Sequence, residues 1–346
     1  MGNSNESADK GKIVALSDTH LGDHSELLID SRLVDRLCDV LAGRGQIGEL
    51  VLLGDVVDLW VNRETTALGR ARYFIESICA LPNITRIVYV PGNHDHQMFM
   101  FNFYDEMNRK VRAGDLSLPH FLPARSYPTT LLSGIAGDPR VKDFSMAYPF
   151  IVRRVAGRKV VLSHGHHLDF FDRSFGWART YWLARYFIAA RGGKRKKKIT
   201  LQELELANLP FYGAMAVTPW VPEIVIGELR FYSFINFFAR LFRKGELKKG
   251  LRRDTLIQEN YKQIGELLPL FDQADADCFV FGHTHRPGVG RVPDSSLVVG
   301  NTGSWVRQEG KDVPSMTWIE LDDKMSLYQL TETGPGFMGS ESLNPG

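Results

Sequence analysis

The sequence of 346 residues has only three cysteines, Cys38, Cys79 and Cys278, which lie far apart in apolar surroundings. This spacing argues against a disulfide framework and against a zinc knuckle. A thiol-poor composition is typical of proteins in a reducing compartment, so we expect a cytoplasmic location.

Long hydrophobic runs are also missing, because charged residues interrupt every long apolar stretch, and this argues against a membrane-spanning helix. Residues 1–12 are polar and contain no hydrophobic core of a signal peptide. Met1-Gly2 resembles a myristoylation signal, but Glu6 stands where Ser or Thr is required. We therefore predict that residues 1–11 are a disordered lead-in. The net charge of +2 says little about partners.

Apolar runs alternate with helical patterns in the first 90 residues. The periodicity predicts strands at 12–17, 50–53 and 86–90, with helices at 30–42 and 65–80 between them. This order is typical of a parallel sheet with crossover helices. Ligands of such sheets collect beyond the carboxyl ends of the strands.

The later parts of the chain read differently, as short strands and tight turns. Strand-like runs occupy 129–132, 150–155, 159–162, 296–299, 316–321 and 324–330. Residues 156–158 predict a turn that joins two of these runs in a hairpin. We therefore predict an α/β fold of two mixed sheets packed together with helices outside. The predicted domain spans 12–335 and contains an insertion at 168–250, and a flexible tail is expected at 336–346.

Five short stretches share one pattern, in which an apolar run and a small residue precede side chains that ligate metals. They are Leu16–His20, Leu53–Asp58, Pro91–Asp95, Leu162–His166 and Phe281–His285. Six of the ten histidines lie in these stretches, whereas His24, His96, His120 and His167 are expected to be ordinary surface or core residues. Any one motif alone is typical of a turn or a surface pair. Five together indicate a pair of divalent cations that activates water for attack on phosphorus.

The ordered set of these motifs resembles the calcineurin-like metallophosphoesterases. The resemblance implies a four-layer αββα sandwich and a dinuclear site in which a metal-bridging hydroxide attacks phosphorus. Asp18, His20 and His285 would hold one metal, Asn93, His164 and His283 would hold the other, and Asp55 would bridge the two. His94 matches the family's acid, with Asp95 orienting its ring and Asp58 fixing a ligand or the loop. His166 and Arg286 would contact substrate.

The donor types restrict the metal as well. Imidazole and oxygen ligands without thiolate suit manganese, iron, zinc or cobalt better than magnesium or calcium. The family resemblance favours Mn2+, so two manganese ions are the expected cofactors.

The insertion at 168–250 is rich in aromatic and basic residues. Its segments 170–190 and 231–243 have amphipathic helical patterns, and a basic run follows the first, at Lys194–Lys198. Together with Gly282–Pro287 and Asn301–Trp305, the chain resembles the UDP-2,3-diacylglucosamine hydrolases of lipid A synthesis, which cut a pyrophosphate between a nucleotide and a lipid-bearing sugar. Two departures are the histidine at 94, where those enzymes typically have arginine, and a longer insertion. We expect a helical cap, a lipid-linked phosphate substrate and peripheral contact with the inner face of the cell membrane.

Other functions fit parts of the pattern. A soluble nucleotide phosphodiesterase or a protein phosphatase would use the same metals. A nuclease would use the basic residues of the insertion on a phosphate backbone, but its apolar faces are larger than base stacking needs, so we do not expect nucleic acid as a partner. A non-catalytic scaffold resembling a retromer subunit is disfavoured because every ligand position is filled. The oligomeric state stays open.

Overall fold

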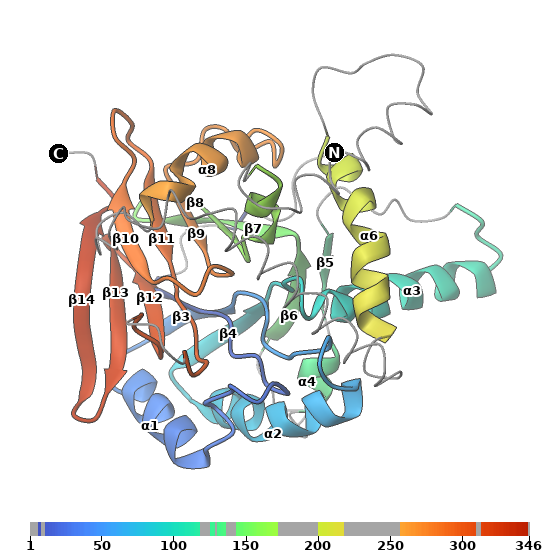
Figure 1. Ribbon diagram of the computed structural model, residues 1–346, viewed down its shortest axis with the longest axis horizontal. Helices are drawn as coiled ribbons and strands as arrows, with labels where there is room; N and C mark the ends of the chain where they lie inside the picture. Colours follow the sequence, from blue (N-terminus) through green and yellow to red (C-terminus); the bar gives the residue numbers. More distant parts are fainter. Residues whose placement is uncertain are drawn as a thin grey trace, which may run out of the picture.

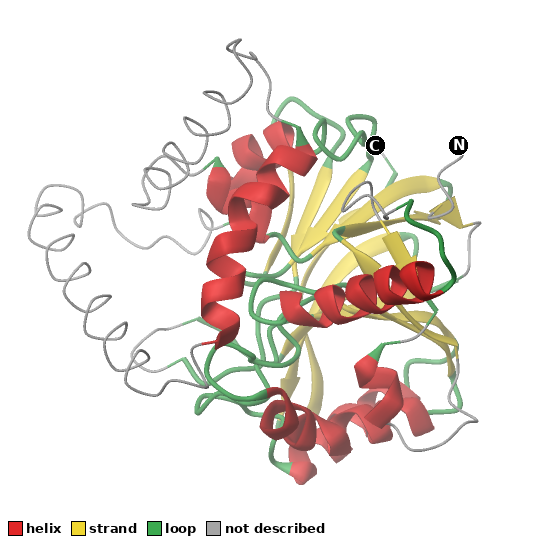
Figure 2. Ribbon diagram, turned by 90° about the vertical axis from the view of Figure 1, so that its right-hand side faces the viewer, coloured by secondary structure: helices red, strands yellow, loops and turns green. Residues whose placement is uncertain are grey.

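The structure is a computed structural model that describes residues 6–7, 11–117, 125–128, 130–135, 143–171, 200–217, 257–308 and 313–344. Two sheets pack against each other, and helices cover both outer sides (Figures 1 and 2). In Figure 1, α1 (Ser31–Ala42) and α2 (Glu64–Ala80) lie on one side of the sheets and α8 (Tyr261–Leu267) lies on the other. The predicted α/β sandwich of two mixed sheets is confirmed.

Eight strands of the described residues form the larger sheet. In spatial order they are β14 (Gly334–Ser342), β13 (Lys324–Thr331), β12 (Thr317–Leu321), β2 (Ile13–Leu16), β3 (Ile47–Leu52), β4 (Ile84–Tyr89), β6 (Asp143–Tyr148) and β5 (Arg125–Tyr127). The central strands β2, β3, β4 and β6 run parallel. Helix α1 connects β2 to β3 and α2 connects β3 to β4. The predicted order of strands and crossover helices is therefore confirmed.

The smaller sheet has six described strands. In spatial order they are β1 (Glu6–Ser7), β7 (Phe150–Val155), β8 (Arg158–Ser163), β9 (Cys278–Phe281), β11 (Val298–Asn301) and β10 (Gly288–Arg291). The predicted hairpin joins β7 to β8 through Ala156 and Gly157, whose φ angles are 50° and 77°. Positive φ at both positions gives a turn whose twist matches that of the strands.

Three separate apolar clusters fill the spaces between layers. One packs α1, α2 and α3 (His96–Arg112) on the outer face of the larger sheet. The second lies between the two sheets, where alternate residues of β2, β3 and β4 meet those of β7, β8 and β9. The third packs α8 on the outer face of the smaller sheet. Three cores between four layers are what the αββα arrangement requires.

Part of the insertion is described. It begins with the 3-10 turn η1 (His166–Phe170) and includes α6 (Leu201–Val217), which packs beside α3 (Figure 2). Two further short helices of the described residues are α4 (Leu131–Ile135) and η4 (Gln258–Asn260). Among the described residues no helix is both long and apolar enough to cross a membrane. Most of the predicted amphipathic segments 170–190 and 231–243, and the basic run 194–198, lie outside the described residues.

Two local predictions are wrong. Residues 131–135 form helix α4 instead of a strand, because the hydroxyl of Ser133 accepts a hydrogen bond from the Thr130 N–H and donates one to the Thr130 carbonyl. The expected flexible tail is strand β14 through residue 342, since it pairs with β13 along its length. Of the expected disordered lead-in, residues 1–5 and 8–10 lie outside the described residues, and Glu6–Ser7 pairs with β7. Backbone pairing of this kind leaves little trace in a polar or glycine-rich sequence.

Candidate metal centre

Five strand ends place the predicted ligands at one edge of the sandwich. Strands β2, β3 and β4 of the larger sheet lead into the first three motifs, and β8 and β9 of the smaller sheet lead into the other two. All seven predicted metal ligands meet there, namely Asp18, His20, Asp55, Asn93, His164, His283 and His285. The structure therefore brings together every ligand proposed from the motifs, although their roles as ligands stay predictions.

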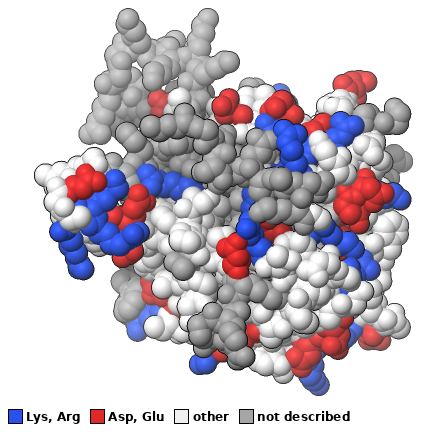
Figure 3. Space-filling model, turned by 180° about the vertical axis from the view of Figure 1, so that it is seen from behind, with Lys and Arg blue, Asp and Glu red and all other residues white. Residues whose placement is uncertain are grey.

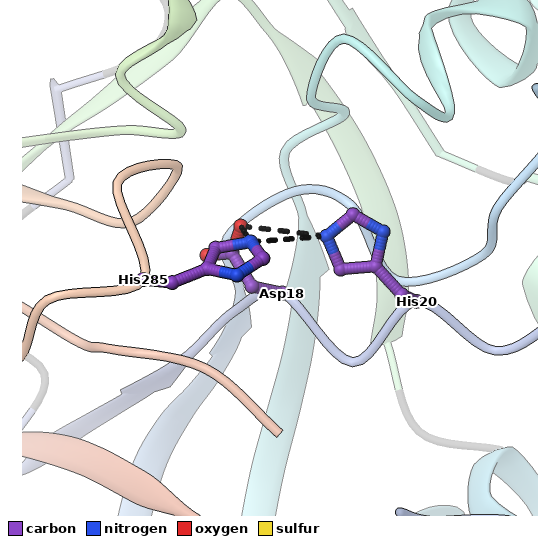
Figure 4. Close-up of side chains that lie close together, drawn as sticks. All are labelled: Asp18, His20 and His285. Atoms are coloured by element: carbon purple, nitrogen blue, oxygen red, sulfur yellow. Dashed lines mark hydrogen bonds and ion pairs between the residues drawn. The ribbon is translucent and has the colours of Figure 1, made fainter. Parts of the chain in front are cut away.

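The first group consists of Asp18, His20 and His285 (Figure 4). Asp18 Oδ2 accepts the backbone N–H of His283 at 2.9 Å. The other oxygen, Oδ1, lies 3.1 Å from His285 Nε2 and 3.8 Å from His20 Nε2, and the two ring nitrogens are 3.2 Å apart. Within the described part of the chain, this buried Oδ1 accepts no hydrogen bond. A carboxylate oxygen and two imidazole nitrogens that face one point fit a divalent cation.

Asp55 lies between this group and a second one. Its Oδ1 accepts the backbone N–H of His94 at 2.9 Å, while its Oδ2 lies 3.1 Å from His164 Nε2 and 3.7 Å from His20 Nε2. His164 Nε2 is also 3.2 Å from Asn93 Oδ1, and His283 completes the group with Asp55 and His164. One carboxylate oxygen thus faces imidazoles of both groups, as a bridging ligand must.

Hydrogen bonds behind the rings decide which nitrogen of each histidine faces inward. His164 Nδ1 donates to the Leu53 carbonyl at 2.9 Å, and His20 Nδ1 lies 3.0 Å from Asp58 Oδ2. His283 uses the opposite nitrogen, since its Nε2 lies 2.8 Å from Asp169 Oδ2. A ring that donates from one nitrogen keeps a lone pair on the other for a metal.

The backbone at this edge is strained. Five of the seven predicted ligands have positive φ, between 43° and 63°: Asp18, His20, Asp55, His283 and His285. Such conformations cost energy outside glycine and cluster at functional sites. The preceding glycines are needed for space, because a Cβ on Gly92 would lie 2.2 Å from Asp55 Oδ1 and one on Gly282 would lie 2.4 Å from Asp18 Oδ2. This explains the small residue in these motifs.

Charge in the site is balanced between carboxylates and imidazoles. Burial lowers the pKa of His164, but the charges of Asp55 and Asp18 outweigh it and raise that pKa to about 9. Burial would raise the pKa of Asp18, yet His285 and His164 hold it well below its usual range. Metal ligands must be deprotonated, so cations that enter the site release these imidazole protons and take over the neutralisation of the carboxylates. The donor set therefore fits a pair of divalent cations.

His94 stands at the edge of this group with its side chain 24% exposed. Its Nδ1 lies 2.8 Å from Asp58 Oδ2, and its ring stacks on Trp60 with centroids 3.9 Å apart. Since Nδ1 donates to Asp58, Nε2 is the ring nitrogen left for exchanging a proton with a bound molecule. Asp58 also holds His20, so a single carboxylate orients a ligand and the predicted acid.

Asp95 does not orient His94, contrary to the role inferred from the motif. Its two oxygens accept the backbone N–H groups of Val56 at 2.7 Å and Gly92 at 2.6 Å. The side chain is fully buried, and burial together with the charge of Asp55 raises its pKa to about 6. Asp95 therefore joins two of the loops that carry ligands, and Asp58 holds the ring of His94 instead.

A family model described as calcineurin-like phosphoesterase matches residues 11–287. The chain belongs to the calcineurin-like phosphoesterase family. It is accordingly a phosphoester hydrolase, and the resemblance drawn from the five motifs is confirmed at the level of the family. No curated protein matches the chain.

Solved structures similar to this phosphoesterase have low identity. One is a dimetal phosphatase from Danio rerio, 13% identical, with TM-score 0.38 and coverage of 97% of this chain and 99% of that chain. Another is Vps29 complexed with Zn2+ from Entamoeba histolytica, 12% identical, with TM-score 0.38 and coverage of 96% and 99%. A third is a conserved uncharacterized protein from Streptococcus pneumoniae TIGR4, predicted to be a phosphoesterase, 12% identical, with TM-score 0.36 and coverage of 97% and 98%. The family assignment rests on the family match and not on these structures.

The two predicted substrate contacts of the phosphoesterase differ in exposure. His166 is buried, with its ring 5.6 Å from that of His164 and its Nε2 3.4 Å from the Tyr148 hydroxyl. Arg286 is exposed and pairs with Glu259 at 3.4 Å. Both assignments stay predictions.

Two neighbours of the site were not found from the sequence. Trp60 stacks on His94, and Asp169 holds His283. Asp169 follows His166 within the turn η1, so its spacing from the histidine motif was a usable signal. Nothing in the local pattern distinguishes Trp60 from a core aromatic residue.

Proposed function

We propose that this phosphoesterase hydrolyses a lipid-linked phosphoester or pyrophosphate of the UDP-2,3-diacylglucosamine kind, with a pair of manganese ions. The observation that supports the reaction is the convergence of seven ligands beside a partly exposed His94. When bound, two divalent cations lower the pKa of water and neutralise charge on phosphoryl oxygens. Iron, zinc or cobalt would fit the same donors.

The chain itself handles the proton of the leaving group. Asp58 accepts a hydrogen bond from His94 Nδ1–H, so the imidazolium form of His94 presents its second N–H, on Nε2, to a bound molecule. Stacking on Trp60 restricts the tilt of this ring. We propose that His94 donates that proton to the departing oxygen. Burial raises the pKa of Asp58, but the charges and hydrogen bonds of His94 and His20 together lower that pKa by more, so Asp58 is ionised. Its negative charge in turn stabilises the charged ring of His94.

The insertion supports the lipid-linked substrate. Its predicted start at residue 168 follows closely on the predicted ligand His164, and Asp169 in its first turn contacts the predicted ligand His283. The described start of the insertion therefore lies beside the predicted metal ligands. The aromatic and basic amphipathic pattern of 170–190 and 231–243 suits acyl chains and anionic headgroups.

We also propose peripheral binding to the cytoplasmic face of a membrane through the insertion. On the face shown in Figure 3, basic and acidic side chains of the described residues are interspersed. Charges on the described surface also form ion pairs, for example Arg72–Glu76 and Arg109–Asp105. Such a surface attracts anionic lipid weakly, so we assign the attraction to the basic run 194–198. Sedimentation with phosphatidylglycerol vesicles should fall when these lysines and arginine become glutamine, and unchanged binding would contradict the assignment.

The test of the function is release of UMP from UDP-2,3-diacylglucosamine in mixed micelles with Mn2+. The wild type should release UMP and the Asp55→Asn variant, which lacks the bridging charge, should not. Turnover of a generic aryl phosphodiester without UMP release would retain the reaction and refute this substrate. If soluble nucleotides or phosphoproteins are turned over equally well with and without detergent, a soluble phosphodiesterase or protein phosphatase is the better description.

A further inference from the structure

A second group of potential ligands lies beside the dinuclear site. His166 and His167 belong to η1, and Glu205 belongs to α6 of the insertion. Each offers one ligand atom, and the three atoms lie within 4.8 Å of one another. All three side chains are buried, with His167 and Glu205 fully excluded from solvent. His167 was expected to be an ordinary residue, so this group appears only in the folded chain.

The group holds more polar atoms than partners. Glu205 Oε1 contacts His167 Nε2, and Glu205 Oε2 accepts the Tyr148 hydroxyl at 2.9 Å. Within the described structure, Nδ1 of His166 and Nδ1 of His167 are buried and have no hydrogen-bond partner. The Tyr148 hydroxyl is 3.4 Å from His166 Nε2, which is long for a hydrogen bond. An unsatisfied buried polar atom costs roughly 1–3 kcal/mol, so these two ring nitrogens are expected to have a partner that the described residues do not supply.

A bound cation would account for this arrangement. Two imidazoles and one carboxylate form a ligand set that suits zinc and other borderline divalent metals. The hydrogen bond from the Tyr148 hydroxyl to Glu205 Oε2 would fix the orientation of this carboxylate, because metal ligands are commonly oriented by hydrogen bonds from neighbouring groups. His96 adds another imidazole nearby, with Nε2 at 4.0 Å from Glu205 Oε2.

We propose that His166, His167 and Glu205 bind a third divalent cation, of the zinc type, separate from the dinuclear pair. The site adjoins that pair, since the ring of His166 lies 5.6 Å from the ring of His164 and 6.5 Å from that of His283. These three side chains fill three of the four tetrahedral positions of zinc, and His96 lies near enough to the group to be a candidate for the fourth. The cation joins helix α6 of the insertion to the turn that follows His164.

The alternative is a buried ion pair between His167 and Glu205 without a metal. An ion pair accounts for the contact between these two residues, but it leaves His166 and both Nδ1 atoms without a role. The two explanations differ in the number of metals per chain. This difference does not depend on which substrate the enzyme hydrolyses.

The experiment counts metals in the purified full-length protein grown with zinc and manganese. Elemental analysis and native mass spectrometry should give three divalent cations per wild-type chain and two for Glu205→Gln. Glu203→Gln, on the same helix but hydrogen-bonded to Thr200 at the helix start, is the matched control and should keep three. A wild-type count of two that Glu205→Gln leaves unchanged would overturn the proposal.

A crystal of the wild type provides a measurement that needs no variant. An anomalous map at the zinc edge should show a peak about 2.0–2.2 Å from one nitrogen each of His166 and His167 and from Glu205. If Glu205→Gln fails to fold, this map alone decides. Peaks confined to the dinuclear pair would refute the third site while leaving the proposed hydrolysis untouched.

Discussion

Asp58 links the predicted acid to the metal ligands, and its replacement by asparagine tests how the site works. Asp58 Oδ2 lies 2.8 Å from His94 Nδ1 and 3.0 Å from His20 Nδ1, while Oδ1 accepts the N–H groups of Trp60 and Val61 at 3.1 Å each. Asparagine keeps the shape and the bonds of Oδ1. Its amide nitrogen, however, is a donor and would face two ring N–H donors.

The size of the effect follows from the lost bonds. A hydrogen bond to a charged group contributes about 1.5–3 kcal/mol. Each increase of about 1.36 kcal/mol in the activation free energy lowers the rate tenfold, so loss of the hydrogen bond to His94 should lower kcat by about 10- to 150-fold. Loss of the bond to His20 should also weaken metal binding, by about 10- to 100-fold. Rates are therefore compared at saturating Mn2+, with bound metal measured by elemental analysis.

The assay uses two aryl phosphodiesters that differ only in the leaving group, p-nitrophenol or phenol. Phenol needs the acid more, so Asp58→Asn and His94→Ala should both slow the phenyl ester more than the nitrophenyl ester. The variant that combines Asp58→Asn with His94→Ala should have a kcat only slightly below that of His94→Ala alone, because both residues act on the same proton. Asp30→Asn, an exposed carboxylate at the start of α1, should leave both rates unchanged. Equal slowing of both esters at full metal occupancy, or additive losses, would refute the assignment of His94 as the acid.

Three further predictions test the site and the core. Gly92→Ala should abolish metal binding, because the added methyl would lie 2.2 Å from a carboxylate oxygen of Asp55, the predicted bridging ligand. Gly134→Ala, whose added methyl would have no atom within 4 Å, should bind metal normally. Equal metal content in the two variants would contradict the packing argument. Glu49→Ala removes the buried carboxylate that pairs with Arg153 and should lower the free energy of unfolding in urea by about 3–5 kcal/mol, whereas the exposed Glu76→Ala should lower it by less than about 1 kcal/mol; similar losses for the two variants would count against the buried pair. Burial raises the pKa of the Cys278 thiol to about 12, so at pH 8 it stays protonated and should resist iodoacetamide until the protein unfolds; rapid alkylation of the native protein would show that the thiol is accessible and ionised.

Much of the fold and of the candidate site was predicted from the sequence. The alternation of strands and helices through residue 90 and the hairpin at 156–157 follow from periodicity and turn chemistry, which act over a few residues. The five motifs stood out because each follows an apolar run, and the resemblance to the family then implied the seven candidate ligands. They meet in the structure because the strands before them end at a common edge. Helix α4 and strand β14 were missed, because a side-chain cap and an edge pairing outweighed weak local patterns.

The partners of the charged side chains depended on tertiary structure. Asp58 and Asp95 have similar local surroundings in the sequence, yet one holds the rings of His20 and His94 and the other holds two backbone amides. Asp169 and Glu205 were not predicted to lie beside histidines at all. Local sequence thus determines which segments form strands and which residue types their ends carry, because both depend on neighbouring residues. Which carboxylate meets which imidazole is decided by distances of a few ångströms between residues far apart in the chain, and only the packing of the two sheets and the insertion sets those distances.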